Sequence, residues 1–272
     1  MPRNFPGALF AVLLIPALAT AGPSALVTND KNDGPGSLRA ALNSGATNIR
    51  IRPSVGTIAV TETLIYEGTA PLTIIGSGQT IYGADLSDNS APVLAITQGA
   101  DLSITKLTVD AGGRNAAGPY NRLNQGGGKG IFVDVPVTRT GTVSVDLTNV
   151  TVRGTGNHGI HVSDCTRGDE CGGGSGGGGD GSPASVDVRL VGVQIEDSGN
   201  GKQDADGLRV DERGDGDITF FATESAFNDN GADGVELDEG NNGDVNINVT
   251  NSTFDYNCLL YTSDAADDSA LV

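Results

Sequence analysis

The stretch DGLRVDE at residues 206–212 returns 27 residues later as DGVELDE at residues 233–239. Apolar and polar residues alternate in both copies, which is the period of a β-strand with one buried face. A second alternating strand follows each copy, ITFFA at 218–222 and VNINV at 245–249. A repeat of this length made of short strands predicts a solenoid in which each repeat forms one coil.

Two earlier copies fit the same frame. HGIHV at 158–162 precedes VDVRL at 186–190, and KGIFV at 129–133 precedes VSVDL at 143–147. The copies are separated by 29, 48 and 27 residues, counted between Gly130, Gly159, Gly207 and Gly234. The extra residues fall between the strands, as expected of stacked coils with loops that face solvent. We therefore expect an all-β, parallel β-helix domain over residues 22–257, with less regular coils before residue 129.

The composition limits the classes of partner. The chain has 272 residues, 41 glycines, no tryptophan and a formal net charge of −18. A protein that binds nucleic acid or an anionic membrane surface gains affinity from positive charge, which this chain lacks. We expect neither partner, and we expect no membrane insertion.

The two ends differ in character from the repeat. Residues 1–21 carry Arg3, an apolar stretch and a small-residue Ala-Thr-Ala end, the pattern of a secretory signal peptide. We therefore expect a secreted or cell-surface protein. The repeat predicts a glycine after Asn257, yet Cys258 stands there. Residues 258–272 resemble a translated sequencing adapter, so we interpret them as a non-native tail and expect aggregation through an uncapped last coil.

Two cysteines, Cys165 and Cys171, lie in a glycine-rich insertion. Because an exported protein meets an oxidising compartment, a local disulfide is the preferred interpretation. A metal site is the weaker alternative, since neither cysteine has a second ligand pair at zinc-like spacing.

A resemblance to a known family comes from the start of the mature chain. The run GPGSLRAAL at 34–42, followed by Ile49-Arg50-Ile51, resembles the entrance helix and first strand of right-handed parallel β-helix proteins of the pectate-lyase-like (pectin lyase fold) superfamily. Ser37 would cap a short N-terminal helix that covers the open end of the solenoid. The resemblance implies a fold, and that fold carries lyases, hydrolases, adhesins and stalks alike.

The repeat also predicts which outward side chains share a column. Coils stack about 4.8 Å apart, so one column should contain Phe132, His161, Arg209 and Glu236, and the next Asp134, Ser163, Asp211 and Asp238. The candidate catalytic residues are His161, Arg209 and Glu236. The candidate glycan face consists of Phe132, Asp134, Asp211 and Asp238.

Three interpretations of these columns remain open. A lyase needs a base and a cation beside a uronate, which Arg209 or His161 and bound Ca²⁺ would supply. A hydrolase needs two carboxylates, for which Asp211 and Asp238 are a possible pair. The third interpretation, which we favour, is a cross-strand ion pair between Arg209 and Glu236 on a solvated face.

A calcium site is expected in the turn that follows the repeated strand. Oxygen-bearing residues recur there from one coil to the next, and hard cations favour stacked oxygen ligands. The six candidate ligands are Glu212, Asp215, Asp217, Glu239, Asn242 and Asp244. No organic cofactor is expected.

The sequence therefore predicts a secreted or cell-surface repeat protein with a structural, adhesive or glycan-binding role, stabilised by Ca²⁺. Its expected partner is a polysaccharide or a cell-surface component. The alternative is a polysaccharide lyase or glycoside hydrolase that acts on acidic polysaccharide.

Overall fold

The computed structural model describes residues 22–87, 91–113, 128–164, 181–199, 205–257 and 270–271. These residues form eighteen β-strands and one α-helix. In chain order the elements are β1 (Ser24–Val27), α1 (Leu38–Asn43), β2 (Asn48–Ile51), β3 (Ile58–Ala59), β4 (Leu64–Tyr66), β5 (Leu72–Tyr82), β6 (Leu94–Ile96), β7 (Leu102–Asp110), β8 (Ile131–Asp134), β9 (Gly141–Thr155), β10 (Ile160–Ser163), β11 (Ala184–Val191), β12 (Gln194–Ser198), β13 (Leu208–Glu212), β14 (Ile218–Thr223), β15 (Ala226–Asn228), β16 (Val235–Glu239), β17 (Val245–Thr250) and β18 (Ala270–Leu271).

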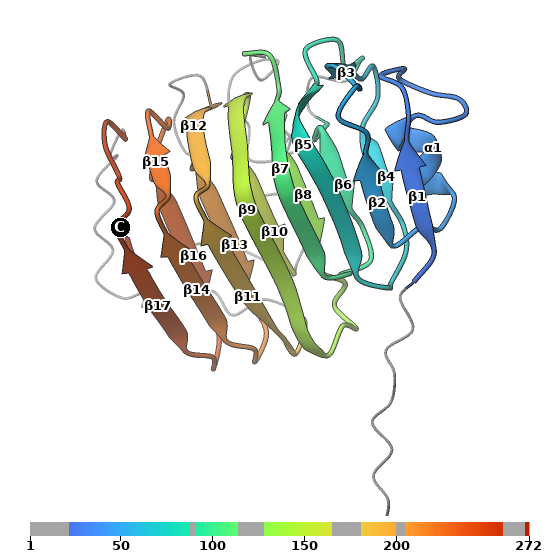
Figure 1. Ribbon diagram of the computed structural model, residues 1–272. Coiled ribbons are helices and arrows are strands. Elements are labelled where there is room, and N and C mark those ends of the chain that lie inside the picture. The colour runs from blue at the N-terminus through green and yellow to red at the C-terminus, as the bar shows by residue number, and fades with distance from the viewer. Residues whose placement is uncertain are drawn as a thin grey trace, which may run out of the picture.

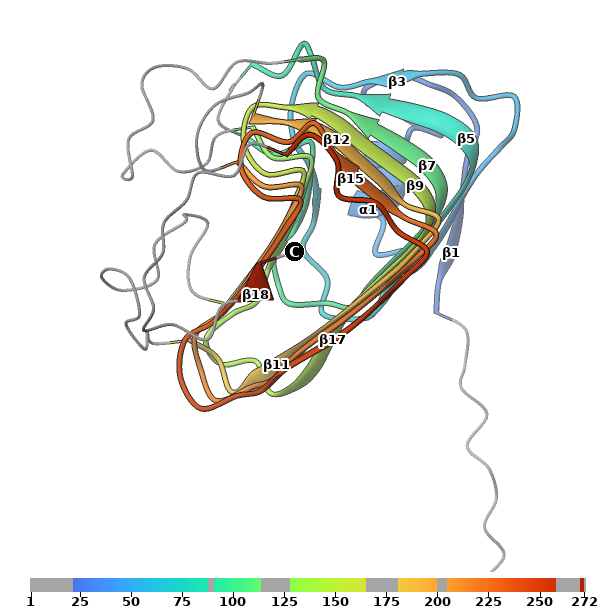
Figure 2. The ribbon, with the colours of Figure 1, turned by 90° about the vertical axis from the view of Figure 1, so that its left-hand side faces the viewer.

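The strands form two sheets, which we call the long sheet and the short sheet. The long sheet has eleven strands, with β1-β2-β5-β7-β9-β11-β14-β17 along its main path and β3, β12 and β15 beside it. The short sheet has seven strands in the order β18-β16-β13-β10-β8-β6-β4. Successive coils lie side by side from right to left in Figure 1 and largely superimpose when viewed along the stack in Figure 2. The expectation of an all-β fold of parallel strands is confirmed, and the arrangement is consistent with a β-solenoid.

The register between coils agrees with the repeat read from the sequence. In the short sheet, Leu208 of β13 pairs in parallel with Ile160 of β10 and with Val235 of β16. In the long sheet, Ile218 of β14 pairs with Val186 of β11 and Val245 of β17. The parallel strands of the short sheet have three to five residues each, while the connections differ in length, with 20 residues between β7 and β8 and between β10 and β11.

Alternation along each strand places the apolar side chains inside the coil. In β11, for example, Val186, Val188 and Leu190 are fully buried while the residues between them are more exposed. The inward residues of successive coils form one continuous apolar core. Burying such side chains is the main favourable contribution to folding.

A column of left-handed residues bends the wall of the long sheet. Lys106, Asn149, Gly192, Glu224 and Asn251 have φ angles between 50° and 62° and occupy the same place in five successive coils. An L-residue with a side chain reaches this conformation only at some cost. Each coil therefore turns at one fixed position, and β11/β12 and β14/β15 are strand pairs separated by it.

Helix α1 packs beside the first strands. The Ser37 side chain accepts a hydrogen bond from the Ala40 N–H, and Leu38, Ala41 and Leu42 are buried. The helix contacts β1, β2 and β4 and lies beside them at the N-terminal end of the stack (Figure 1).

The opposite end is less covered. Ile247 in β17 is 39% exposed, whereas Phe220, its partner in β14, is 1% exposed. Beyond β16 the short sheet continues with β18, which pairs in the antiparallel direction.

Within the described ranges, no helix is both long and apolar enough to cross a membrane. The signal-peptide prediction, the Cys165–Cys171 disulfide and most of the predicted non-native tail lie outside the described residues.

The aromatic stack inside the last coils provides a test of the packing. Phe227 is fully buried, lies 4.8 Å from the Phe254 ring and 6.2 Å from the Phe220 ring, and is expected to lose about 3–5 kcal/mol of stability on change to Ala. Phe221→Ala is the matched control, because Phe221 lies outside the core and contacts Arg189. Urea unfolding followed by circular dichroism measures both variants. Equal losses in the two variants would contradict the assigned core.

Candidate functional site

The predicted columns meet on the outer side of the short sheet. His161 pairs with Phe132 and Arg209, and Arg209 pairs with Glu236, as the repeat predicts. Ser163, Asp211 and Asp238 form the neighbouring column with Asp134. The sequence therefore placed these side chains correctly relative to one another.

The expectation that these columns form a solvated face is wrong. His161 and Asp211 are fully buried, Phe132 is 1% exposed and Arg209 is 6% exposed. Glu236 and Asp238 keep about a fifth of their side-chain surface, 20% and 19%. Charges in such a place interact much more strongly than on an open surface, and they need partners.

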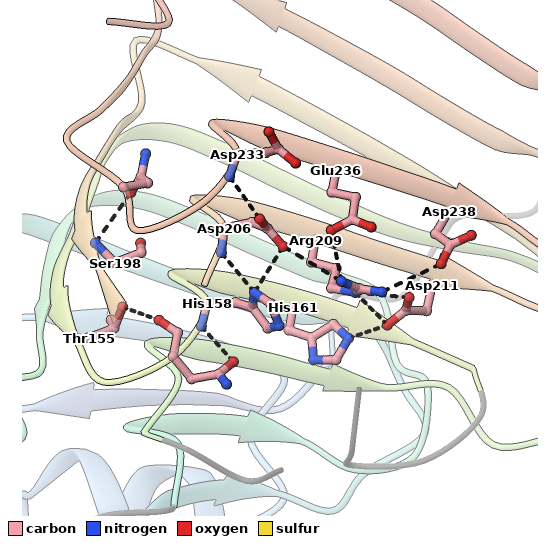
Figure 3. A network of polar contacts seen from close by, with 12 residues as sticks. Thr155, His158, His161, Ser198, Asp206, Arg209, Asp211, Asp233, Glu236 and Asp238 are labelled. Carbon is pink, nitrogen blue, oxygen red and sulfur yellow. Dashed lines mark hydrogen bonds and ion pairs between the residues drawn. The ribbon is translucent and has the colours of Figure 1, made fainter. Parts of the chain in front are cut away.

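Arg209 is the centre of the charged network (Figure 3). Its Nε donates to both oxygens of Asp211 at 3.0 and 3.2 Å, and its Nη1 donates to Glu236 at 2.7 Å. Asp238 lies 3.5 Å from its Nη2 and also pairs with Arg213. The guanidinium group thus joins β13 to β16 and is engaged by carboxylates on both strands.

His161 lies one coil before Arg209 and is held by the same carboxylate. Its Nε2 is 2.6 Å from Asp211 Oδ2. Burial lowers the pKa of His161 to about 4, with Lys129 adding to the effect and the hydrogen bond to Asp211 opposing it. Burial alone would raise the pKa of Asp211, but Arg209 and His161 outweigh it and hold that pKa well below its usual range. Near neutral pH the pair is a neutral imidazole that donates to a carboxylate.

Asp206 and His158 form a second contact beside this pair (Figure 3). His158 Nδ1 accepts the Asp206 N–H at 2.9 Å and lies 3.1 Å from Asp206 Oδ2, and both side chains are fully buried. Asp206 Oδ1 accepts the Asp233 N–H of the next coil at 3.0 Å. The two histidine rings lie edge to face, with centroids 5.1 Å apart.

Two carboxyl groups in the network have pKa values displaced in opposite directions. Burial raises the pKa of Glu236 well above its ordinary value, and Asp206 adds to that rise. For Asp206, burial is outweighed by His158 and Arg209, so its pKa lies below the ordinary value. The pKa values of these two neighbouring carboxyl groups are therefore displaced away from each other, which is the electrostatic arrangement of an acid beside a base.

A group of three carboxylates could hold a metal ion. One oxygen of each of Asp206, Asp233 and Glu236 lies within 4.8 Å of the other two. The set differs from the six ligands predicted for the turn. Oxygen ligands at such spacing suit a hard divalent cation.

In the predicted calcium turn, backbone and amide N–H groups already bind the carboxylates. Glu212 Oε1 accepts the N–H groups of Gly214 and Gly216, and Glu239 Oε1 accepts those of Asn241 and Gly243. Two further carboxylates accept in the same way, Asp215 from the Asn241 and Asn242 side chains and Asp217 from the Asp244 N–H. Glu212 and Glu239 thus stabilise the turn itself, a use of oxygens that composition alone does not reveal.

The predicted glycan face is mostly inaccessible. The Phe132 ring packs against His161 at 5.5 Å and lies under Lys129. Asp211 is engaged by Arg209 and His161, and Asp238 by Arg209 and Arg213. Only Asp134 and Asp238 of this set are partly exposed.

An open groove lies on another wall of the stack. It has a volume of about 300 Å³ and is lined chiefly by acidic residues and one arginine: Asp110, Gly113, Arg153, Gly154, Glu196, Asp197 and Asp229. Arg153 donates to Asp110 at 2.9 Å and has 48% of its side chain exposed. Burial, with Asp229 and Asp110 nearby, raises the pKa of Asp197. None of the predicted site residues line this groove.

Sequence reasoning missed His158, Asp206, Asp233 and Arg213 as members of the network. Asp206 and Asp233 were visible as the Asp of the repeated Asp-Gly pair, directly before each strand. His158 also precedes a glycine, in the equivalent place of an earlier coil. The position before Gly in the repeat was therefore the available signal.

Comparisons with protein-family models, with curated proteins and with solved structures found no match to this chain.

Removing the Arg209 guanidinium group should destabilise the folded chain. Arg209→Met leaves Asp211 buried without its principal cation and is expected to cost about 3–5 kcal/mol. The matched control is Arg153→Met, which breaks one exposed pair and should cost at most about 1 kcal/mol. Urea unfolding measures both. A loss for Arg209→Met no larger than for the control would contradict the assigned network.

The chain has only two histidines, so His161 can be followed by NMR. Its imidazole should stay neutral until the pH falls to about 4. Because the unfolded ring binds a proton near pH 6.5, this group removes stability as the pH falls from 6.5 to 4. Asp211→Asn should lower the pKa further, and the distant, exposed Asp215→Asn should leave it unchanged. Titration of His161 near pH 6.5 would contradict its burial.

Proposed function

We propose that this chain is a secreted or cell-surface module with a structural and glycan-binding role, built as a right-handed parallel β-helix of the pectin lyase fold. The parallel sheets, the constant register and the entrance-helix sequence support this fold. The signal-like residues 1–21 support export.

The observation that carries the proposal is the engagement of Arg209. A lyase needs a cation that can neutralise a substrate carboxylate. Here the guanidinium group is 6% exposed and contacts Asp211, Glu236 and Asp238. These contacts join β13 to β16 and neutralise charge within the wall, which favours a structural role for the network.

Glycan binding is proposed for the open groove around Arg153. The groove offers an exposed Arg–carboxylate pair and three further carboxyl groups, Glu196, Asp197 and Asp229. Such polar groups can hydrogen-bond sugar hydroxyl groups. This placement replaces the glycan face that was predicted beside Phe132.

Binding and turnover can be separated in one experiment on the full chain. Immobilised polysaccharides, neutral and uronate-containing, are incubated with the protein with and without Ca²⁺, and retention and released sugar are both measured. We expect retention without release, lost in Arg153→Ala and kept in Arg209→Lys. Retention that is unaffected by Arg153→Ala would contradict the groove assignment, and no retention on any polymer would contradict glycan binding.

A glycoside hydrolase is the second candidate, favoured by the opposite pKa displacements of Glu236 and Asp206. Glu236 would protonate the leaving oxygen and Asp206 would act as the carboxylate partner. In the same experiment, released sugar that disappears in Glu236→Gln would establish this function and overturn the non-catalytic proposal.

Calcium stabilisation is proposed at the three carboxylates of Asp206, Asp233 and Glu236 instead of the turn. A divalent ion bound only by the folded chain would reduce their mutual repulsion and would add stability that rises with the logarithm of the ion concentration above its Kd.

A further inference from the structure

Two carboxyl groups outside the Arg209 network lie close to the place where the two ends of the β10–β11 connection, Asp164 and Ser182, come together. We call this place the neck of the connection. Asp164 directly follows β10, and Glu212 ends β13 in the next coil. Their exposed fractions are 1% and 0%. Asp164 Oδ2 accepts the N–H of Ser182, at the far end of the connection, at 2.6 Å. Its Oδ1 accepts the N–H of Arg213 at 3.0 Å, so one carboxylate ties the neck to the following coil.

Glu212 has one satisfied oxygen and one that needs a partner. Its Oε1 accepts the N–H groups of Gly214 and Gly216 at 3.0 and 3.3 Å. Its Oε2 is buried and meets no donor in the described part of the chain. A buried acceptor without a donor is costly. A proton on Oε2 removes this cost, because the resulting hydroxyl can donate to the neighbouring Asp164 carboxylate.

The charges that face this pair come from three strands and the turn. Asp211 of β13 and Glu239 of β16 are like charges, and Asp164 itself follows β10. Arg213 contributes its backbone N–H here, while its guanidinium group pairs with Asp238. Burial and Asp164 raise the pKa of Glu212 to about 8, although the Gly214 and Gly216 N–H groups oppose the rise. Burial likewise raises the pKa of Asp164.

The neck and the turn are closely packed at this place. A side chain at Gly181 would collide with the Gly214 amide and the Asp164 carboxylate. The two carboxyl groups therefore lie in a confined part of the structure.

We propose that Asp164 and Glu212 share one proton that fastens the turn at residues 212–217 to the neck of the β10–β11 connection, and that loss of this proton on a rise in pH releases the turn. The closed turn thus forms a pH-sensitive lock between two coils.

The range of pH follows from linkage. The closed turn holds its proton up to about pH 8, whereas a released Glu212 has its ordinary pKa of 4.5. Between these values opening liberates a proton, so the opening equilibrium constant should rise about tenfold per pH unit. Below about pH 4.5 the closed and open forms both hold the proton, and above about pH 8 neither does. In both ranges the opening equilibrium constant should not change with pH.

Hydrogen exchange of the full-length chain tests the lock. After correction for intrinsic exchange, protection of the Arg213, Gly214 and Gly216 amides should fall about tenfold from pH 6 to pH 7. Glu212→Gln should abolish this dependence, because its amide donates to Asp164 and still accepts at Oε1 without titrating.

Glu239→Gln is the matched control, since Glu239 holds the equivalent turn one coil later. It should keep the wild-type pH dependence at residues 213–216. Level protection of these amides in the wild type would overturn the proposal, as would a Glu212→Gln variant that follows the wild-type profile.

Discussion

The backbone N–H and C=O groups of each coil form most of their hydrogen bonds with the coils on either side. The need to pair these groups fixes the register between coils, and the rest of the structure depends on that register. A shift of one residue would turn every inward side chain outward. With the register fixed, residues 27 positions apart lie side by side, as Arg209 and Glu236 do. The same step positions the polar ladders, such as the Asp233 N–H on Asp206 and the Asp244 N–H on Asp217.

Stacking also brings like charges of successive coils close together, and in the short sheet local partners offset their repulsion. The chain has a formal net charge of −18, and identical carboxylates of successive coils would lie about 5 Å apart. Arg209 lies in the column beside Asp211 and Asp238 and contacts carboxylates on two strands. At Asp164 and Glu212, for which the described residues supply no paired cationic side chain, we propose that a shared proton serves the same purpose. The Arg209 ion pairs and the proposed shared proton both link coils, which supports the structural role that we propose.

The sequence predicted the parallel strands, the register and the membership of the two outward columns. It could do so because period-2 alternation and a 27-residue repeat determine which side chains share a side and a level. It could not predict that His161 and Asp211 are buried, because alternation says nothing of what covers the outer side of a sheet. Composition likewise did not reveal that Glu212 and Glu239 accept backbone N–H groups of their own turns, and the Ca²⁺ site predicted there stays a prediction. Asp206 and His158 precede their strands, where alternation gives no information.

A charge network centred on Arg209 links successive coils of the short sheet. A double-mutant cycle on Arg209→Met and Glu236→Gln, measured by urea unfolding, tests it most directly because the two residues lie on adjacent strands. We expect a coupling free energy of about 1–3 kcal/mol between the two changes. Effects that add to within about 0.5 kcal/mol would contradict it.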